Sequence, residues 1–566
     1  MSRRSFEQLA GRLMLGLVMV VIAAPAALSQ TSTGSIRGYV ADSSGNPILG
    51  LVPAEYEVTA RQIGMTPQKV PVRVLIGEVF PLDFKLATSA IQLEVVTVAA
   101  AAGVEMRTSE VATNVTQQQI ERLPTASRNF LDLAALAPGV TTSEDRVNGI
   151  GFRTFQGGGA SPNQSNIFVD GTSLKNDLTG GGVSGQDASR GNPFPRSAIQ
   201  EYRVITQNFK AEYQKASSAI ITATTKSGTN KWTGNVLFGF QDKGLVALDS
   251  FQVRDKHFAD SIAAKNGTPS TFVKPDYTRS LPSISVGGPI QKDRLFFFGS
   301  YEGNYQNRAN AVDFRPPTGI AALDSVQLAQ RYNGNFTSPF RESLGFGKLS
   351  YTIDSKSSAE LSVSDRHETD VRDFGNVNCS MCSFHEAVNF RQNTTIAQLK
   401  YSRFSGAWLN EAKVDYSRFQ RDPSPNTPGL VSRLFHYPGQ DAQIGSNLST
   451  QNFIQKRLGL RDDVTHQSGG QHVFKGGVSV DFVTYDIDKR NNETPKFEYA
   501  QFVDSANYGW TTDTTQLRFD FRNPYTLSYG TGVGFVSAKN TQVGAYIQDD
   551  WSPTPRLTIN LGIRWD

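Results

Sequence analysis

The stretch Leu349-Ser-Tyr-Thr-Ile-Asp-Ser-Lys-Ser-Ser-Ala-Glu-Leu-Ser-Val-Ser364 alternates apolar and polar residues on both sides of a polar turn. Every second residue from Leu349 to Ile353 is apolar, and the same period resumes from Ala359 to Val363 after the turn. A period of two belongs to a β-strand, whose successive side chains point to opposite faces. The stretch therefore predicts a β-hairpin with one apolar face.

The same alternation recurs after Asn230, and the strands are joined by two kinds of connection. Short turns such as 355–358 and 552–555 are interspersed with long polar stretches. Transmembrane barrels combine short turns at one end with long loops at the other, whereas a soluble sandwich keeps most connections near ~4–6 residues. The spacing therefore favours a barrel over a sandwich. Further alternating segments are 236–240, 295–301, 411–417, 474–482 and 557–563, and the long stretches are 241–278, 303–345 and 420–454.

The alternation predicts about eleven strands, roughly half of the 22 found in plugged outer-membrane transporters. A half-barrel would leave an unpaired strand edge in lipid, where each unsatisfied backbone group costs several kcal/mol. We therefore expect the sequence to be a fragment of a longer barrel protein.

Composition and charge are consistent with a mainly β protein. The 50 glycines and the 10% aromatic content favour strands joined by turns. Lys and Arg number 56 against 52 Asp and Glu, with no long block of one sign. A nucleic-acid partner is therefore not expected.

The first residues carry an export signal. Arg3, Arg4 and Arg12 precede or flank the apolar run Leu13–Ala24, which is followed by a small-residue sequence ending at Ser29. The run is shorter than the ~20 residues of a spanning helix, so we expect cleavage after Ser29, with an uncleaved anchor as the alternative. No later segment approaches ~18 consecutive apolar residues, which leaves a closed barrel as the way to cross a membrane.

The region 34–91 holds short strand candidates and turn residues, including Gly38-Tyr-Val-Ala-Asp, Gly45-Asn-Pro and Val52-Pro-Ala-Glu-Tyr-Glu-Val. It resembles the carboxypeptidase regulatory-like domain, a carbohydrate-binding-like β-sandwich, over residues 34–86. The strands expected between Pro47 and Leu51 are missing, so the sandwich is shortened. The resemblance leaves two roles open, sugar binding and a structural spacer.

Residues 120–230 combine helical and strand patterns. Phe130, Leu133, Leu136 and Ala137 lie at helical spacing in a helix predicted to end at Pro138-Gly139. Ile167-Phe-Val-Asp-Gly171 reads as a strand entering a turn, and Thr225-Lys-Ser-Gly-Thr-Asn230 follows a further strand. This pattern predicts a mixed α/β unit.

These motifs resemble the plug domain of TonB-dependent outer-membrane receptors, and most closely the Oar-like group with a regulatory-like domain in front. The resemblance implies a signal peptide at 1–29, a regulatory-like domain at 34–91, a TonB-box-like segment and plug at 93–229, and a partial outer-membrane barrel at 230–566. It places the TonB-box-like segment at Glu94, Val95, Val96, Thr97, Val98 and Ala99, and the plug motif at Arg128, Asn129, Phe130, Asp170, Gly171 and Lys226.

Residues 214–219, Gln-Lys-Ala-Ser-Ser-Ala, depart from the family pattern, which usually has glycines there. We therefore expect the last plug strands to pack differently from those of the family.

The resemblance implies a receptor in the outer membrane that binds a large solute and imports it with energy from the inner membrane. The expected partners are a TonB-like energy-transducing protein, outer-membrane lipid and the solute, which is a carbohydrate, a peptide or a metal chelate. The regulatory-like domain favours carbohydrate by fold analogy alone. The alternative is an Oar-like structural or adhesion protein without transport.

Other chemistry finds little support in the sequence. Cys379-Ser-Met-Cys382 predicts a local disulfide in an exported loop, because Ser383 stands where c-type haem attachment needs a histidine and further zinc ligands are lacking. His385-Glu-Ala-Val-Asn389 lacks the second histidine of a zinc-protease motif, and Gly180–Gly185 lacks the strand and helix of a dinucleotide site. We therefore expect no enzyme, metal or cofactor, and the missing metal ligands argue against an exported carboxypeptidase or its accessory chain.

Overall fold

The computed structural model describes residues 35–37, 54–60, 68–75, 79–81, 108–125, 128–147, 150–179, 183–186, 189–314, 331–375, 381–437, 440–468, 471–500, 524–554 and 557–566. The predicted signal peptide, the segment Glu94–Ala99 and Cys379 lie outside these ranges. In the described part of the chain, no helix is both long and apolar enough to cross a membrane.

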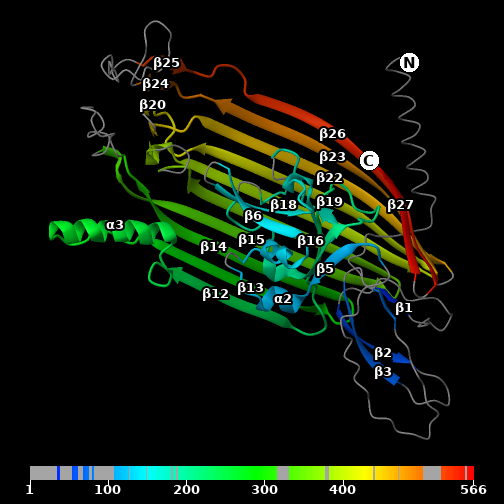
Figure 1. Cartoon of the computed structure of the whole chain (residues 1–566). Helices are drawn as coiled ribbons and strands as arrows, with labels where there is room; N and C mark the ends of the chain where they lie inside the picture. The colour runs from blue at the N-terminus through cyan, green and yellow to red at the C-terminus, as the bar shows by residue number, and fades with distance from the viewer. Residues whose placement is uncertain are drawn as a thin grey trace, which may run out of the picture.

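The alternating segments form one curved antiparallel sheet of eleven strands, each bonded to the next strand of the sheet along the chain (Figure 1). This confirms the predicted barrel wall and its strand number, and the wall is open between its two edge strands. The strands are β12 (Thr233–Asp242), β13 (Tyr277–Gln291), β14 (Leu295–Val312), β15 (Gly334–Asp354), β16 (Ser357–Arg372), β18 (Val388–Ser405), β19 (Trp408–Pro425), β22 (Ser449–Ser468), β23 (His472–Asn491), β26 (Phe535–Thr554) and β27 (Leu557–Trp565).

Two expected loops are shorter than predicted, and a third contains a helix. Strand β14 continues to Val312 and β15 begins at Gly334, so most of 303–345 is strand, and β19 likewise continues to Pro425. The stretch 241–278 contains helix α3 (Ser250–Asn266), which was not expected. The ends of the strands that extend beyond the bilayer form backbone hydrogen bonds with each other but need no apolar outer face. Their side chains therefore show no alternation of apolar and polar residues.

The two faces of the wall differ as the alternation requires. Leu361 and Val363 on β16 are 45% and 44% exposed on the outer face, whereas Arg366 and Glu368 of the same strand are buried on the inner face. An apolar outer surface with polar residues inside is the pattern of a lipid-embedded barrel.

Aromatic rings gather beside the short turns of the wall. Trp408 stacks on His466 with ring centroids 4.1 Å apart, and His472 lies between Phe474 and Trp551 at 5.4 and 5.5 Å. Aromatic belts of this kind mark the level at which a barrel meets the lipid headgroups. They place the short-turn end of the wall at one membrane interface.

Residues 111–225 form a smaller unit on the concave side of the wall (Figure 1). Its five-stranded sheet has the order β5-β10-β11-β8-β9, with β11 parallel to β8. A separate hairpin joins β6 and β7. The elements are β5 (Val111–Val115), α2 (Gln117–Arg122), η1 (Phe130–Leu136), β6 (Val140–Val147), β7 (Ile150–Gly157), η2 (Pro162–Gln164), β8 (Asn166–Val169), β9 (Thr172–Ser173), η3 (Arg196–Ala198), β10 (Ile199–Gln207) and β11 (Ile220–Thr225).

The predicted helix over 128–137 is a 3₁₀ helix, η1, and Leu136 is 47% exposed where the spacing placed it in the core. A 3₁₀ helix has three residues per turn and keeps Phe130, Leu133 and Leu136 in line, so the helix type does not account for the exposure of Leu136, which is the last residue of η1. Phe130 and Leu133 are buried as predicted.

Four short strands are described in the region 34–91. Strands β2 (Ala54–Ala60) and β3 (Gln68–Val74) form an antiparallel pair, and β1 (Ser35–Arg37) runs parallel to β4 (Val79–Pro81). They lie near the short-turn end of the wall (Figure 1). The shortened sandwich remains a prediction.

At the opposite end of the wall, the long connections build a second five-stranded sheet, called here the outer sheet, with the order β17-β21-β20-β24-β25. It has its own apolar core, which includes Phe374, Phe435 and Tyr499. Cys382 in this sheet is disulfide-bonded, and its pairing with Cys379 stays a prediction. The strands are β17 (Met381–Cys382), β20 (Ser432–Tyr437), β21 (Gln440–Ile444), β24 (Lys496–Ala500) and β25 (Thr526–Ser528), with η4 (Phe384–Glu386) beside them.

The outer sheet should lose stability as pH rises, because burial raises the pKa of Glu386 to about 8. Its carboxyl lies 3.1 Å from the Ser432 hydroxyl and 2.9 Å from the Gln443 amide nitrogen, and both donate to it. The fold favours the protonated acid, so stability falls between pH 4.5, the ordinary value, and about 8. Hydrogen exchange of β20 and β21, corrected for intrinsic rates, should show weaker protection at pH 9 than at pH 6.

The variant Glu386→Gln should remove this pH dependence, while the control Glu498→Gln on β24 should keep it. If β20 and β21 of the wild type are equally protected at both pH values, the predicted effect of Glu386 on stability is wrong.

Candidate functional site: the seam between plug and wall

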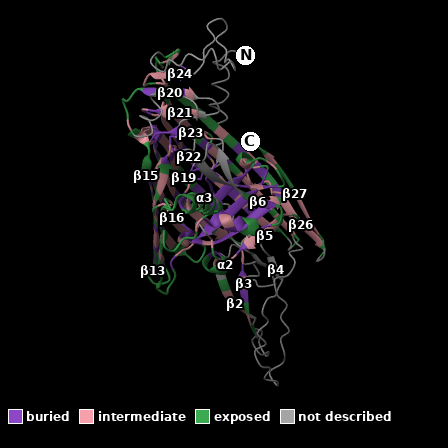
Figure 2. Cartoon of the chain, turned by 60° about the vertical axis from the view of Figure 1, so that its left-hand side comes forward, coloured by how far each residue is buried: buried purple, intermediate pink, exposed green. Residues whose placement is uncertain are grey.

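The α/β unit, called here the plug, meets the inner wall along a seam formed by charged and polar side chains. Figure 2 shows the buried residues concentrated in the plug and on the strands that face it. The wall residues in the plug's apolar core are few, namely Phe298 and Phe346, with Ile396 packed against it. Hydrogen bonds and ion pairs make up most of the remaining described contacts, so the seam is more polar than the plug core.

Two residues of the predicted plug motif make contacts within the plug. Asn129 caps η1, since its side-chain oxygen accepts from the Leu131 backbone N–H at 3.0 Å, while its amide donates to Gln186 at 2.9 Å. The buried Phe130 ring meets Tyr202 edge-on at 5.7 Å, and the Tyr202 hydroxyl donates to the Phe130 carbonyl at 2.9 Å. These residues join η1 to β10.

Arg128 is the motif residue that crosses the seam near η1. It has φ +60°, a left-handed conformation, and its guanidinium lies 3.6 Å from Glu302 on β14. The Ser197 backbone N–H also donates to Glu302, at 2.6 Å. One wall carboxylate therefore binds two separate parts of the plug.

The turn Asp170-Gly171 makes the next contact with the wall. Asp170 accepts from the backbone N–H and the hydroxyl of Thr225 at 2.9 and 2.5 Å, and it lies 3.4 Å from the ammonium of Lys348 on β15. Gln398 on β18 donates to the Asp170 carbonyl at 2.8 Å. Burial alone would raise the pKa of Asp170, but Lys348 and Thr225 outweigh burial and hold it below its usual value.

Backbone geometry explains the residue types in this turn. Asp170 and Gly171 have φ of +45° and +79°. Glycine adopts this left-handed region freely, and Asp and Asn tolerate it better than most residues.

Lys226 has a different role from the other motif residues. Its backbone N–H donates to the Ala198 carbonyl at 2.7 Å, and its ammonium lies 2.9 Å from Glu121 of α2. Glu121 is half exposed. Lys226 therefore braces the end of β11 against the plug, and its described contacts do not reach the wall.

A buried cluster closes the seam nearer the outer end of the wall. Arg366 on β16 lies 3.2 Å from Glu342 and also pairs with Glu368, and its Nε donates to the Asn192 carbonyl of the plug at 2.7 Å. The Asn192 backbone N–H donates to Glu342 at 2.7 Å. A Cβ on the neighbouring Gly191 would lie 2.0 Å from the Glu342 carboxylate, so glycine permits this close approach.

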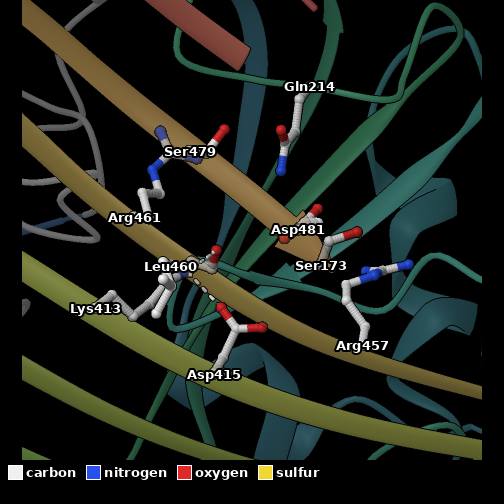
Figure 3. Close-up of a pocket in the computed structure, with 10 residues that line it drawn as sticks. Ser173, Gln214, Lys413, Asp415, Arg457, Leu460, Arg461, Ser479 and Asp481 are labelled. Atoms are coloured by element: carbon white, nitrogen blue, oxygen red, sulfur yellow. Dashed lines mark hydrogen bonds and ion pairs between the residues drawn. The ribbon is translucent and has the colours of Figure 1, made fainter. Parts of the chain in front are cut away.

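On the other side of the plug, the seam contains a small cavity of about 20 Å³ that is partly open to solvent (Figure 3). Asp415 on β19 and Asp481 on β23 flank Gly459 in register on β22, and a Cβ at Gly459 would lie 2.9 Å from each carboxylate. The glycine therefore leaves space on the inner face of the wall. The other lining residues are Gly171, Ser173 and Gln214 of the plug and Lys413, Arg457, Leu460, Arg461 and Ser479 of the wall.

The wall half of the site was not identified from sequence. Lys348, Arg366 and Asp481 occupy inward positions of strands that were predicted, and a charged residue on the inner side of an alternating strand was the available signal. In the described part of the chain, no three His, Cys, Asp or Glu residues group as a metal site.

Comparison with known proteins is consistent with this architecture. Residues 224–330 and 316–566 match an outer membrane beta barrel domain, and residues 104–220 match a TonB-dependent receptor plug domain. The chain belongs to the TonB-dependent receptors of the outer membrane.

Among individual proteins, the chain is 22% identical to the "TonB-dependent transporter Oar" of Myxococcus xanthus, over 93% of this chain and 54% of that protein. It thus spans about half the length of this relative. Its fold resembles the outer membrane transporter YddB of Escherichia coli (TM-score 0.56, 12% identity, 80% of this chain and 56% of that one). The ferric enterobactin receptor PfeA of Pseudomonas aeruginosa is similar too (TM-score 0.50, 13% identity, 80% and 57%).

Replacing Asp170 with Ala should detach this part of the plug, because it leaves the buried Lys348 without its plug carboxylate. Lys348 keeps Glu360 at 3.3 Å, so the cost is that of one lost charged hydrogen-bond contact, about 1–3 kcal/mol, and Ala is also strained at a positive φ. Protease digestion of the complete protein in membranes should cut the plug faster in Asp170→Ala than in wild type.

Asp170→Asn is the matched control, since it tolerates the same φ and keeps an acceptor for Thr225. Its rate of digestion should lie between those of wild type and Asp170→Ala. Wild-type digestion rates for both variants would show that the turn does not hold the plug.

Proposed function

We propose that the complete protein binds a large solute at the outer sheet and plug and imports it by moving the plug. A TonB-like protein on the inner side of the membrane would supply the energy by pulling the segment Glu94–Ala99. The solute is a carbohydrate, a peptide or a metal chelate, and the regulatory-like region favours carbohydrate by fold analogy.

The polar seam is the observation that carries this proposal. Contacts such as Asp170 with Lys348 and Asn192 with Glu342 are hydrogen bonds between charged or polar groups, and water can replace such partners when the plug moves. An apolar interface of equal area would instead expose a hydrophobic surface to water. A plug that is held by polar contacts can leave the wall and return.

The matched plug and barrel domains support transport as the general class, and the full-length relative is named a transporter. The outward apolar band and the aromatic rings beside the short turns support lipid as the surrounding partner.

Deletion of Leu93–Ala99 from the complete protein should abolish uptake and leave surface binding intact, because the pulled segment is lost while the outer sheet remains. The measurement is uptake and binding of a panel of labelled oligosaccharides, peptides and iron chelates by cells. The matched control deletes Ala100–Met106, which shortens the chain by the same length and should retain uptake.

If binding occurs but deletion of Leu93–Ala99 changes nothing, energy-coupled import is wrong and the adhesion alternative is favoured. If uptake stops in both deletions, linker length and not the segment itself is required.

A further inference from the structure

The connection between β10 and β11, residues 208–219, lies against the wall and is called here the latch loop. It contains the stretch Gln214–Ala219, where the family usually has glycines. Asn208 and Lys215 both have φ +57°. Asn tolerates this left-handed conformation, but Lys rarely adopts it. Backbone strain of this kind persists where surrounding contacts fix the chain.

Ion pairs connect the latch loop to the wall. Lys210 lies 2.9 Å from Asp550 on β26, and Lys215 lies 2.7 Å from Asp481 on β23. Glu212 lies 2.8 Å from Lys475, also on β23. These side chains are at most 19% exposed, so solvent screens the pairs less than it screens surface salt bridges.

Wall arginines also bind the loop. Arg564 on β27 donates to the side-chain oxygen of Gln214 at 2.9 Å and to the Ala211 carbonyl at 3.4 Å, and Arg461 on β22 donates to the Glu212 carbonyl at 3.3 Å. The loop is thus bound by β22, β23, β26 and β27.

The pKa values of Lys210 and Lys215 are shifted in opposite directions. Burial would lower the pKa of Lys210, but Asp550 outweighs burial and raises it. At Lys215, burial and the nearby Arg457 outweigh Asp481, and the pKa is lowered.

The first described residues of the plug are joined directly to the start of the latch loop. Asn208 donates to the Ser109 carbonyl at 2.7 Å, Thr206 donates to the Val111 carbonyl at 3.1 Å, and Val111 pairs with Gln207 at the end of β10. The Ser109 backbone N–H donates to Asn560 on β27 at 2.8 Å. A pull on the chain before Thr108 therefore acts on the latch loop and on β27 through adjacent contacts.

The latch loop also covers the charged cavity. Gln214 lines it from the plug side (Figure 3). Lys215, the next residue, pairs with Asp481 on its wall side. When the loop leaves, the inner face around Gly459 is exposed, with charges of both signs that include Lys413, Asp415 and Arg457.

We propose that the latch loop is the first part of the plug to leave the wall when the preceding chain is pulled, and that its release opens the seam along β22–β27 as the solute path. This proposal rests on the proposed transport function. A path lined by both charges and by Ser479 suits a hydrophilic solute and not an apolar one.

A disulfide between the latch loop and the wall tests the order of release. An added Cβ at Gly562 on β27 lies 2.9 Å from the Ala211 Cβ, so Ala211→Cys with Gly562→Cys can form a bond after a shift of about 1 Å. The matched control is Gly157→Cys with Ala219→Cys, whose Cβ atoms lie 3.2 Å apart and which bonds the last residue of the latch loop to β7 of the plug and not to the wall.

Uptake of the solute found in the panel should fall at least tenfold with the oxidised Ala211–Gly562 pair, recover on reduction, and persist with the control pair. The proposal on the latch loop is wrong if uptake continues with the Ala211–Gly562 bond formed, or if both bonds reduce uptake equally. Neither result contradicts the proposed transport function.

A second measurement is independent of transport. In the purified complete protein, Ser479→Cys should react with N-ethylmaleimide at least tenfold faster when Lys210→Gln and Lys215→Gln are added. Lys226→Gln, which removes a lysine away from the latch loop, should leave the rate unchanged. If the double variant is labelled at the unchanged rate, the proposed role of the latch loop is wrong. If it is labelled faster but no form of the protein takes up solute, the role of the latch loop is supported and the proposed transport function is wrong.

Discussion

Buried charge on the inner face of the wall is the constraint on which the rest of the structure depends. Arg366, Glu368 and Asp370 are each 1% exposed, and an unpaired ion in such a place costs several kcal/mol. Neighbouring wall strands supply some partners, and the plug supplies others through Arg190, which lies 2.9 Å from Asp370, and through the Asn192 carbonyl. Charged groups of the wall therefore have partners in the plug, and these ion pairs and hydrogen bonds fix the position of the plug.

The same constraint explains which parts of the fold the sequence could predict. Strands that cross lipid must alternate, so the hairpin from Leu349 to Val363 and the eleven-stranded wall were predicted from the period alone. Strand ends beyond the bilayer, such as the end of β14 at Val312, carry no such requirement and were mistaken for loops. Helix η1 was predicted as an α-helix because Phe130 and Leu133 have the same spacing in both helix types.

The site was predicted only where its chemistry is local. Asn129 caps the helix that follows it, and Asp170-Gly171 forms a turn, so short motifs were sufficient to select them. Their roles at the seam depend on pairing across the chain, since Lys348 lies 178 residues from Asp170 in sequence. One sequence cannot show which inward lysine meets which turn, and the wall half of the site was therefore missed.

Two kinds of bonding give the plug an order of release. The centre of its β10–β11 pair is apolar, with Val204 and Ile221 fully buried and paired, and separating these strands would expose hydrophobic surface. The seam consists mostly of ion pairs and hydrogen bonds, whose partners water can replace at a small net cost per bond. Ser109, which precedes β5, donates to Asn560 of the wall and accepts from Asn208 of the latch loop, so a pull on the preceding chain acts on these contacts before it acts along β5. The wall contacts of the plug thus yield before its β10–β11 core does, and the plug can move while that core stays folded.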